Sequence, residues 1–195
     1  QLDTSCIIRI CDDNGKEIYE PPKNAHQAIS RATAFMLSDI LEDAAEYGST
    51  AINLNLSIPV SVKTGTVGYT GADGYSDSWT AAYNSDYTIV VWLGYDKTTP
   101  EHYLKNGITG GTYPAKIAGK LFNYLYSSQQ APEFIPPETV VSLEIDTLTL
   151  KNDGVITCAT KDTPEIYRMT DYFNIKYAPS QTSQYWTEPA PPEEL

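Results

Sequence analysis

The stretch Ser57-Ile58-Pro59-Val60-Ser61-Val62-Lys63-Thr64-Gly65-Thr66, in one-letter code SIPVSVKTGT, decides the fold of this 195-residue chain. Apolar and polar residues alternate up to Val62, which is typical of a β-strand. The strand then ends in a lysine, two threonines and a glycine, residue types that build no hydrophobic core. A cation, two hydroxyls and a missing side chain at one strand end indicate either a binding edge or a plain turn.

Each of the four residues from Lys63 to Thr66 has a use at a binding edge. A lysine ammonium can hold a charge or relay a proton, and threonine hydroxyls can bind a carboxylate. Glycine lets another backbone come close, and an N–H of the same strand can face a developing oxyanion. The alternative is a solvent-exposed strand end at which Gly65 starts a turn, because so short a motif is a weak signal by itself.

Composition and charge limit the kinds of molecule that this chain is expected to bind. The chain is 41% hydrophobic, which is enough for one domain, or for one domain with an appendage. Its 13 basic and 25 acidic residues give a formal net charge of −12, which argues against a nucleic-acid partner. No apolar run approaches the roughly 18 residues that span a bilayer, and no signal peptide is visible. We therefore expect any export signal or membrane anchor to lie outside this chain.

The three cysteines, Cys6, Cys11 and Cys158, give no CxxC or CxxH spacing, so a zinc site is not expected. If Cys6 and Cys11 share a strand, their odd spacing puts them on opposite faces. We therefore expect that these two cysteines do not form a disulfide with each other.

Local patterns predict helices and antiparallel strands in the first 130 residues. Asn-Gly supplies the positive φ angles of a tight turn, Ser is a favoured N-cap, and Gly is a favoured residue just after a helix. The expected elements are a hairpin around Asn14-Gly15, a helix from Ser30 to Tyr47 before Gly48, a meander of the opening strand with 78–83 and 87–95, and a helix over 113–126.

Apolar spacing predicts which sides of these elements are buried. The almost continuous apolar run at 89–93 is typical of a strand that is covered on both faces. Each helix carries an apolar stripe at helical spacing. The predicted stripes are Ala32, Phe35, Met36, Ile40 and Ala44 in the first helix, and Tyr113, Ile117, Leu121, Tyr124 and Leu125 in the second.

Residues 131–195 have a different character. They are rich in proline, show no strong helix pattern, and end in a Pro/Glu tail that we expect to fray. The one convincing strand pair joins 140–146 to either 148–150 or 155–156. We expect 131–195 to form a small β-rich appendage rather than a second catalytic domain.

In the order of its motifs, most of the chain resembles the second half of the transpeptidase domain of class A (bifunctional) penicillin-binding proteins. Lys63-Thr64-Gly65-Thr66 matches the third of the three motifs of penicillin-interacting serine enzymes. This resemblance implies an α+β fold like that of serine β-lactamases, an antiparallel sheet flanked by helices, within 1–130. The other similar stretches are the helix 30–48, Trp92-Leu93-Gly94-Tyr95-Asp96, Thr109-Gly110-Gly111, Phe134-Ile135-Pro136 and Ile145-Asp146.

Two motifs of that family do not occur in this sequence. The family's nucleophile lies on Ser-x-x-Lys and its second motif reads Ser-x-Asn, and both precede the Lys-Thr-Gly strand. The resemblance therefore implies that the chain begins inside the domain. It also implies that the nucleophile belongs to an N-terminal portion of the same protein, which is then an obligatory partner, and that this fragment is inactive alone.

The resemblance implies a peptidoglycan D,D-transpeptidase or carboxypeptidase that works through a serine acyl-enzyme and is inhibited by β-lactams. Lys63 and the Thr66 N–H would be catalytic, and Thr64, Gly65 and Thr66 would bind the substrate. The partners would be stem peptides ending in D-Ala-D-Ala and β-lactams, with no nucleic acid, metal or cofactor. The parent protein would also be a glycosyltransferase, anchored at the extracytoplasmic face of the bacterial membrane.

Two alternatives stay open at this point. A β-lactamase or a β-lactam sensor shares the Lys-Thr-Gly strand, although the class A-like tail argues against both. A non-catalytic wall-binding scaffold could keep this fold without a nucleophile. The roughly 200 residues that would precede this chain in a complete domain decide between enzyme and scaffold.

Overall fold

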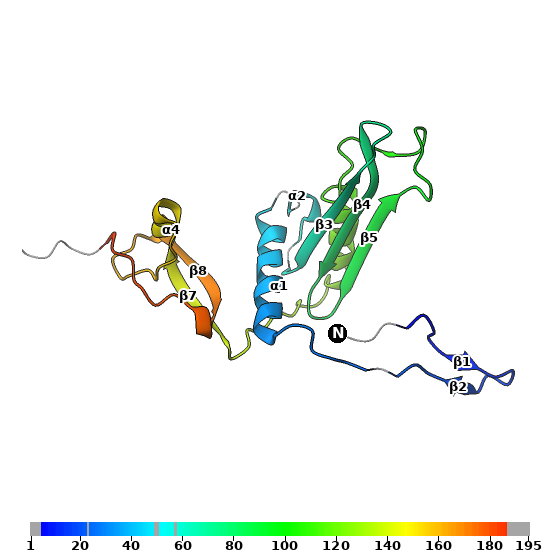
Figure 1. Ribbon diagram of the computed structural model, residues 1–195, viewed down its shortest axis with the longest axis horizontal. Coiled ribbons are helices and arrows are strands. Elements are labelled where there is room, and N and C mark those ends of the chain that lie inside the picture. Colours follow the sequence, from blue (N-terminus) through cyan, green and yellow to red (C-terminus); the bar gives the residue numbers. More distant parts are fainter. Residues whose placement is uncertain (1–4, 23, 49–50, 57, 187–195) are drawn as a thin grey trace, which may run out of the picture.

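A four-stranded antiparallel sheet, made of three long strands and one short one, forms the centre of the protein. The computed structural model describes residues 5–22, 24–48, 51–56 and 58–186. Figure 1 shows strands β3, β4 and β5 side by side, with β3 at one edge of the sheet. The predicted meander is therefore confirmed, while Ser57 lies outside the described residues. The strands are β3 (Ser61–Gly68), β4 (Gly74–Tyr83) and β5 (Thr88–Gly94), and the short β6 (Leu104–Lys105) pairs with the start of β4.

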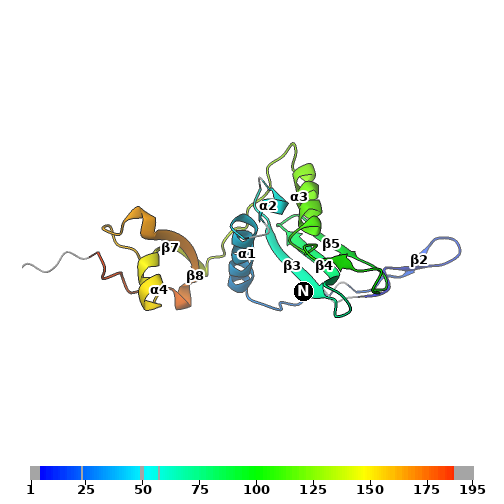
Figure 2. The ribbon, with the colours of Figure 1, turned by 90° about the horizontal axis from the view of Figure 1, so that it is seen from above.

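Helix α3 (Tyr113–Leu125) covers one face of this sheet (Figure 2). The register pairs Val62 with Ala82, and both side chains pack towards α3 in the main core. The short helix α2 (Ala51–Leu54) lies so close that a Cβ at Gly119 would overlap the Leu54 carbonyl. The buried members of the core are Leu54, Val60, Val62, Ala82, Ala115, Ala118, Phe122 and Tyr126.

The buried side of α3 is not the predicted one. Small residues, Ala115, Ala118 and Gly119, face the core because they let the helix approach the sheet and α2 closely. Leu125 packs against the edge of the core. The other four predicted stripe residues are 41% to 78% exposed, so that part of the prediction was wrong; they are Tyr113, Ile117, Leu121 and Tyr124.

Helix α1 (Arg31–Glu46) begins where the sequence predicts. Ser30 accepts a hydrogen bond from the Thr33 N–H, which confirms it as N-cap. The Ser38 carbonyl accepts a 2.7 Å hydrogen bond from Ser61 Oγ and so ties α1 to the start of β3. Because Ser38 faces the sheet, Ile40 lies 61% exposed on the far side. Ala44 is exposed as well, so only the Ala32 and Phe35 end of the predicted stripe is buried.

The second face of the sheet is open over β4 and β5. Ile89 and Val91 pack against the core beneath α3. Val90 and Trp92 point to the opposite face and are 57% and 39% exposed, so the prediction of a strand covered on both faces is wrong for the described residues. Trp79 lies beside Trp92 on this open face, with a ring separation of 6.0 Å.

The N-terminal hairpin reaches away from the sheet (Figure 1). Strand β1 (Ile10–Cys11) pairs with β2 (Glu17–Tyr19), and Gly15 adopts φ 81° in the connecting turn, as predicted. Cys6 lies outside β1, so the two cysteines do not share a strand, and both are exposed free thiols.

An extended connection, 128–138, leads from the α3 end to a C-terminal unit on the far side of α1 (Figures 1 and 2). Its strand pair joins β7 to β8, so the predicted pairing of 140–146 with 148–150 or 155–156 was wrong. Asp146 accepts from the Leu148 N–H and begins a helix there, which Gly154 ends with φ 69°. The elements are β7 (Val140–Asp146), α4 (Thr147–Asp153), η1 (Glu165–Tyr167), β8 (Arg168–Asn174) and η2 (Ile175–Tyr177).

Candidate active site

The predicted site residues Lys63 to Thr66 lie together on the edge strand β3. Side chains alternate along a strand, so Lys63 and Gly65 point to the open face of the sheet. Thr64 and Thr66 point to the opposite face, beneath which α3 begins. A ligand placed along the outer edge of β3, which is unpaired among the described residues, would lie between the ammonium group and the hydroxyls.

Lys63 is exposed, and its ammonium group bends back onto its own strand. Lys63 Nζ donates to the Thr64 carbonyl at 2.9 Å. The neighbouring cross-strand row on this face is aromatic, with Gly65 opposite Trp79 and Trp79 opposite Trp92. A Cβ at Gly65 would touch Trp79 Cβ at 3.4 Å, which is an ordinary contact, so packing against Trp79 does not by itself require a glycine there.

Thr66 is held by the loop that precedes α3. The Gly110 N–H donates to Thr66 Oγ1 at 3.1 Å. The Gly110 carbonyl accepts from Thr80 Oγ1 at 2.6 Å and from the Ala115 N–H at 3.2 Å. A single residue therefore connects the motif strand, the central strand and the first turn of α3.

Residue 110 has to be a glycine at this place. A Cβ there would overlap the Trp79 carbonyl oxygen and lie 2.7 Å from the Gly65 carbonyl oxygen. The sequence indicates Thr109-Gly110-Gly111 only as a loop before the second helix that is similar to the family, and it assigns no role to Thr80. The hydroxyl of Thr80 within the otherwise apolar run 79–82 was the available sign, because a buried hydroxyl needs a partner.

The described residues carry stabilising groups rather than an activated nucleophile. No serine hydroxyl among them bonds to a lysine amine, the arrangement that would activate a serine in this kind of site. Nor does any cluster of three or more metal-ligating side chains occur in the described ranges. What this strand can do chemically is hold a charge, donate hydrogen bonds and position an extended ligand.

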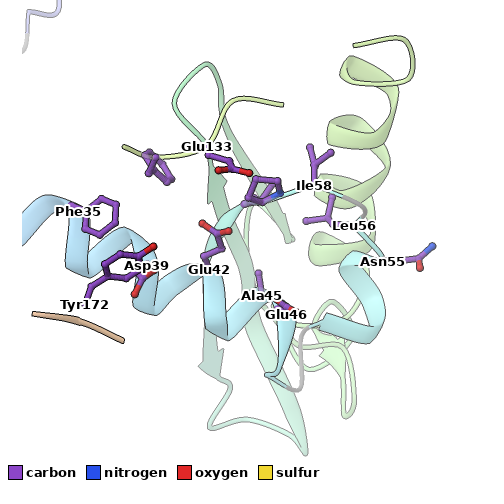
Figure 3. Close-up of a pocket in the computed structure, with 13 residues that line it drawn as sticks. Phe35, Asp39, Glu42, Ala45, Glu46, Asn55, Leu56, Ile58, Glu133 and Tyr172 are labelled. Carbon is purple, nitrogen blue, oxygen red and sulfur yellow. The ribbon is translucent and has the colours of Figure 1, made fainter. Parts of the chain in front are cut away.

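A cavity of about 670 Å³ lies away from the motif strand, between α1, residues 55–56 and 58–60, and the C-terminal unit (Figure 3). The Phe35 and Tyr172 rings meet edge to face there at 5.0 Å. Burial, followed by repulsion from Asp43 and Asp171, raises the pKa of Asp39. No motif residue lines this cavity, so it belongs to the junction with the C-terminal unit rather than to the candidate active site.

Carboxylates crowd the wall that α1 gives to this cavity. Figure 3 shows Asp39, Glu42 and Glu46 along α1, and Glu133 across the cavity from them. Burial and the neighbouring carboxylates also raise the pKa of Glu42 and of Asp43. The junction is therefore an acidic surface in which each negative charge disfavours the others.

In the parts of the chain that the structure describes, no helix has the length and apolarity needed to cross a membrane.

Comparison with known proteins shows the family to which the chain is similar. Residues 5–127 match the family described as Transpeptidase, the penicillin binding protein transpeptidase domain. The chain is 30% identical over 139 residues to penicillin-binding protein 1F of Bacillus subtilis, covering 71% of this chain and 19% of that protein. It is 31% identical over 129 residues to penicillin-binding protein 1A of Pseudomonas aeruginosa, covering 66% of this chain and 15% of the relative.

A solved structure shares the fold over nearly the whole chain. Penicillin-binding protein 1A from Haemophilus influenzae superposes with a TM-score of 0.61 at 19% sequence identity. The superposition covers 93% of this chain and 30% of that one. The chain spans 15% to 20% of the length of the curated relatives it matches.

Proposed function

The chain belongs to the penicillin-binding protein transpeptidase family, and we propose that it supplies the Lys-Thr-Gly-Thr strand of a serine D,D-transpeptidase that crosslinks peptidoglycan. The observation that carries this proposal is the place of Lys63–Thr66 on β3, an edge strand with a free outer side among the described residues. An extended peptide can add to such an edge through main-chain hydrogen bonds. A stem peptide and a β-lactam would both use this edge.

The four motif residues have separate roles in the proposal. Lys63 is exposed and, among the described residues, its ammonium group donates only to the Thr64 carbonyl, so it is available to a serine brought to the open face. The Thr66 N–H donates to the oxyanion that forms on the attacked carbonyl. The hydroxyls of Thr64 and Thr66 hold the substrate carboxylate, and Gly65 keeps the strand edge accessible.

The proposed reaction is acyl transfer in two steps. A serine on the N-terminal portion of the same protein attacks the penultimate D-alanyl carbonyl, the peptide bond breaks, and the terminal D-alanine leaves with the proton. The amino group of a neighbouring stem peptide then attacks the ester carbonyl and releases the serine. Attack by water instead of an amine gives the carboxypeptidase reaction. A β-lactam acylates the same serine and leaves slowly.

Exposed apolar surface supports an N-terminal partner portion. Large apolar side chains are exposed on α1 and α3, and exposed apolar surface of this kind is typical of a face that another part of the protein covers. The open face of the sheet adds further apolar area. The uncovered large side chains are Leu37 and Ile40 on α1, Tyr47 just after it, Tyr113, Ile117, Leu121 and Tyr124 on α3, and Trp79, Val90 and Trp92 on the sheet.

In the proposed parent protein, residues 1–130 complete the transpeptidase domain and 131–195 form an extension behind it. Class A membership further implies a glycosyltransferase in the same polypeptide and an anchor that holds the catalytic domain outside the bacterial membrane. These features belong to the proposed parent protein, and the chain matches 19% of the length of two class A relatives.

Release of D-alanine tests this function directly. The full-length protein should release D-alanine from a pentapeptide substrate, and penicillin should abolish the release. A folded full-length protein that neither releases D-alanine nor becomes acylated by penicillin would contradict the proposal and favour the non-catalytic scaffold.

A further inference from the structure

A row of polar contacts runs behind the motif strand, from β4 through the loop before α3 to Thr66. Thr80 is fully buried, and its hydroxyl donates to the Gly110 carbonyl at 2.6 Å. The N–H of the same residue, Gly110, donates to Thr66 Oγ1 at 3.1 Å. Gly110 is itself buried against the backbone of Gly65 and Trp79, so it has little freedom to move.

The direction of these hydrogen bonds decides what Thr66 can offer a ligand. A threonine hydroxyl has one proton to donate and two lone pairs that accept. The Gly110 N–H occupies one lone pair, and among the described residues Thr66 Oγ1 donates to nothing. The hydroxyl proton is therefore available to a ligand, and a ligand atom that accepts a hydrogen bond is the suitable partner.

We propose that Thr80 and Gly110 are positioning residues that fix the Thr66 hydroxyl as a hydrogen-bond donor and so make the site selective for a ligand carboxylate. This inference rests on the proposed function of β3. Thr80 touches no substrate in this scheme. It acts by holding the Gly110 carbonyl, which keeps the Gly110 N–H pointed at Thr66.

The burial of Thr80 argues that its hydroxyl has this role. A buried hydroxyl without a partner is costly, and a valine of the same shape would satisfy a site that needed packing only. Ser78, the cross-strand partner of Thr66, is a contrasting case nearby, because its buried Oγ has no hydrogen-bond partner among the described residues. Hydroxyls are thus concentrated behind the motif strand, and the one at 80 makes a short bond to the loop.

Paired ligands provide the first test, in the full-length protein. The acylation rate is measured for a β-lactam with a free carboxylate and for its methyl ester, and the ratio of the two rates reports carboxylate selectivity. We expect Thr80→Val to lower this ratio by about threefold to tenfold, since one hydrogen bond to a charged group is weakened. Thr80→Ser keeps the hydroxyl and should preserve the ratio.

A matched control separates this effect from general loss of a buried hydroxyl. Thr149 is also buried and donates to a backbone carbonyl, that of Asp146, but it belongs to the C-terminal unit. Thr149→Val should therefore leave the ratio unchanged. A folded Thr80→Val with the wild-type ratio, or an equal fall in Thr80→Ser, would overturn the inference.

A second measurement does not depend on acylation. Hydrogen–deuterium exchange of the peptide that contains Gly110 should become about twofold to tenfold faster in Thr66→Val, which removes the acceptor of the Gly110 N–H. Thr66 is exposed, so this variant should fold even where Thr80→Val does not. Unchanged exchange would overturn the positioning role, whereas a wild-type protein that no penicillin acylates would overturn the proposed function.

Discussion

Among the residues of the proposed site, Lys63 is expected to contribute most to the rate of acylation. Lys63→Ala should slow acylation by a labelled penicillin by about a hundredfold or more, since a positioned proton-transfer group contributes factors of that size. The measurement is the rate at which label appears on the full-length protein. Lys105→Ala, which removes an exposed lysine of β6 in the same sheet, is the control. An unchanged rate in Lys63→Ala would remove Lys63 from the catalytic residues.

Gly110 provides a prediction about stability. Gly110→Ala forces a Cβ against two backbone carbonyls, of Trp79 and Gly65, which cannot move without disturbing β3 and β4. We expect the free energy of unfolding to fall by about 1–3 kcal/mol or more, as overpacking does elsewhere. Gly68→Ala is the control, because nothing lies within 4 Å of a Cβ at that position. Equal unfolding midpoints in urea for the two variants would contradict the close contact.

At the level of single residues, the sequence predicted the motif but not its support. Lys63 to Thr66 could be recognised because chemistry and strand position coincide in four consecutive residues. Thr80 and Gly110 are 14 and 44 residues beyond Thr66, and only the packing of a loop on a sheet brings them together. No local pattern carries that information.

Among the elements, helix ends and turns that are marked by capping or turn residues in the sequence were predicted correctly. Ser30 begins α1 and Asn14-Gly15 makes the hairpin, because capping and turn geometry depend on a few neighbouring residues. The buried faces of α1 and α3 were not predictable, since apolar residues occupy both sides of each helix. The predicted partner of β7 was wrong because the actual partner, β8, is more than 20 residues away in the sequence and no tight-turn motif connects the two strands.

Asp146 accepts hydrogen bonds from several parts of the C-terminal unit. The stability of that unit should therefore depend on whether the Asp146 carboxyl group is protonated. Burial alone raises the pKa of Asp146. Hydrogen bonds from Ser183, from the Leu148 N–H and from Trp186 outweigh this effect, so the pKa lies below its usual value. Asp146 therefore stabilises the unit above the unfolded pKa, and this stabilisation is lost as the pH falls through the lower folded value.

Replacing this carboxylate tests the assignment. Asp146→Asn should reduce the stability of the C-terminal unit at pH 7 by about 1–3 kcal/mol, because charge-assisted hydrogen bonds become neutral ones. Limited proteolysis within 140–186 measures the change. Asp162→Asn, at an exposed carboxylate of the same unit, should have no effect. Equal protection of both variants would contradict the role of Asp146.

At the scale of the whole molecule, the acidic junction between α1 and the C-terminal unit predicts a pH dependence opposite to that of Asp146. Acid should stabilise the junction rather than weaken it. Burial and like charges raise the carboxyl pKa values on α1, so the ionised forms disfavour the docked arrangement. This penalty is present at neutral pH and is relieved as the pH falls through the raised values. The charged groups that face one another there are Asp39, Glu42, Asp43, Glu46, Glu133 and Asp171.

Docking of the C-terminal unit on α1 should therefore tighten as the pH falls from 7 towards 4. Energy transfer between dyes on α1 and β8 measures the docked fraction. In Asp39→Asn with Glu42→Gln, the unit should be docked more fully at pH 7 and respond less to pH. Transfer that decreases on acidification in the wild-type protein would show that other forces govern the junction.

In the proposed function, this chain forms half of an active site. This chain holds a cation, hydroxyls and an edge strand, groups that lower a barrier only when a nucleophile sits within reach. Its helices and sheet also leave apolar faces uncovered, as a partial core does. Both observations predict a polypeptide that completes its fold and its chemistry only with the segment that carries the serine.

The most direct measurement expresses this chain and the N-terminal segment that we propose to precede it, separately and together, adds labelled penicillin, and resolves the products on a denaturing gel. The account predicts a stable complex only when both pieces are present, with the label on the preceding segment. Label on the band of this chain would contradict it. A well-folded, monodisperse 195-residue product without a partner would contradict it as well.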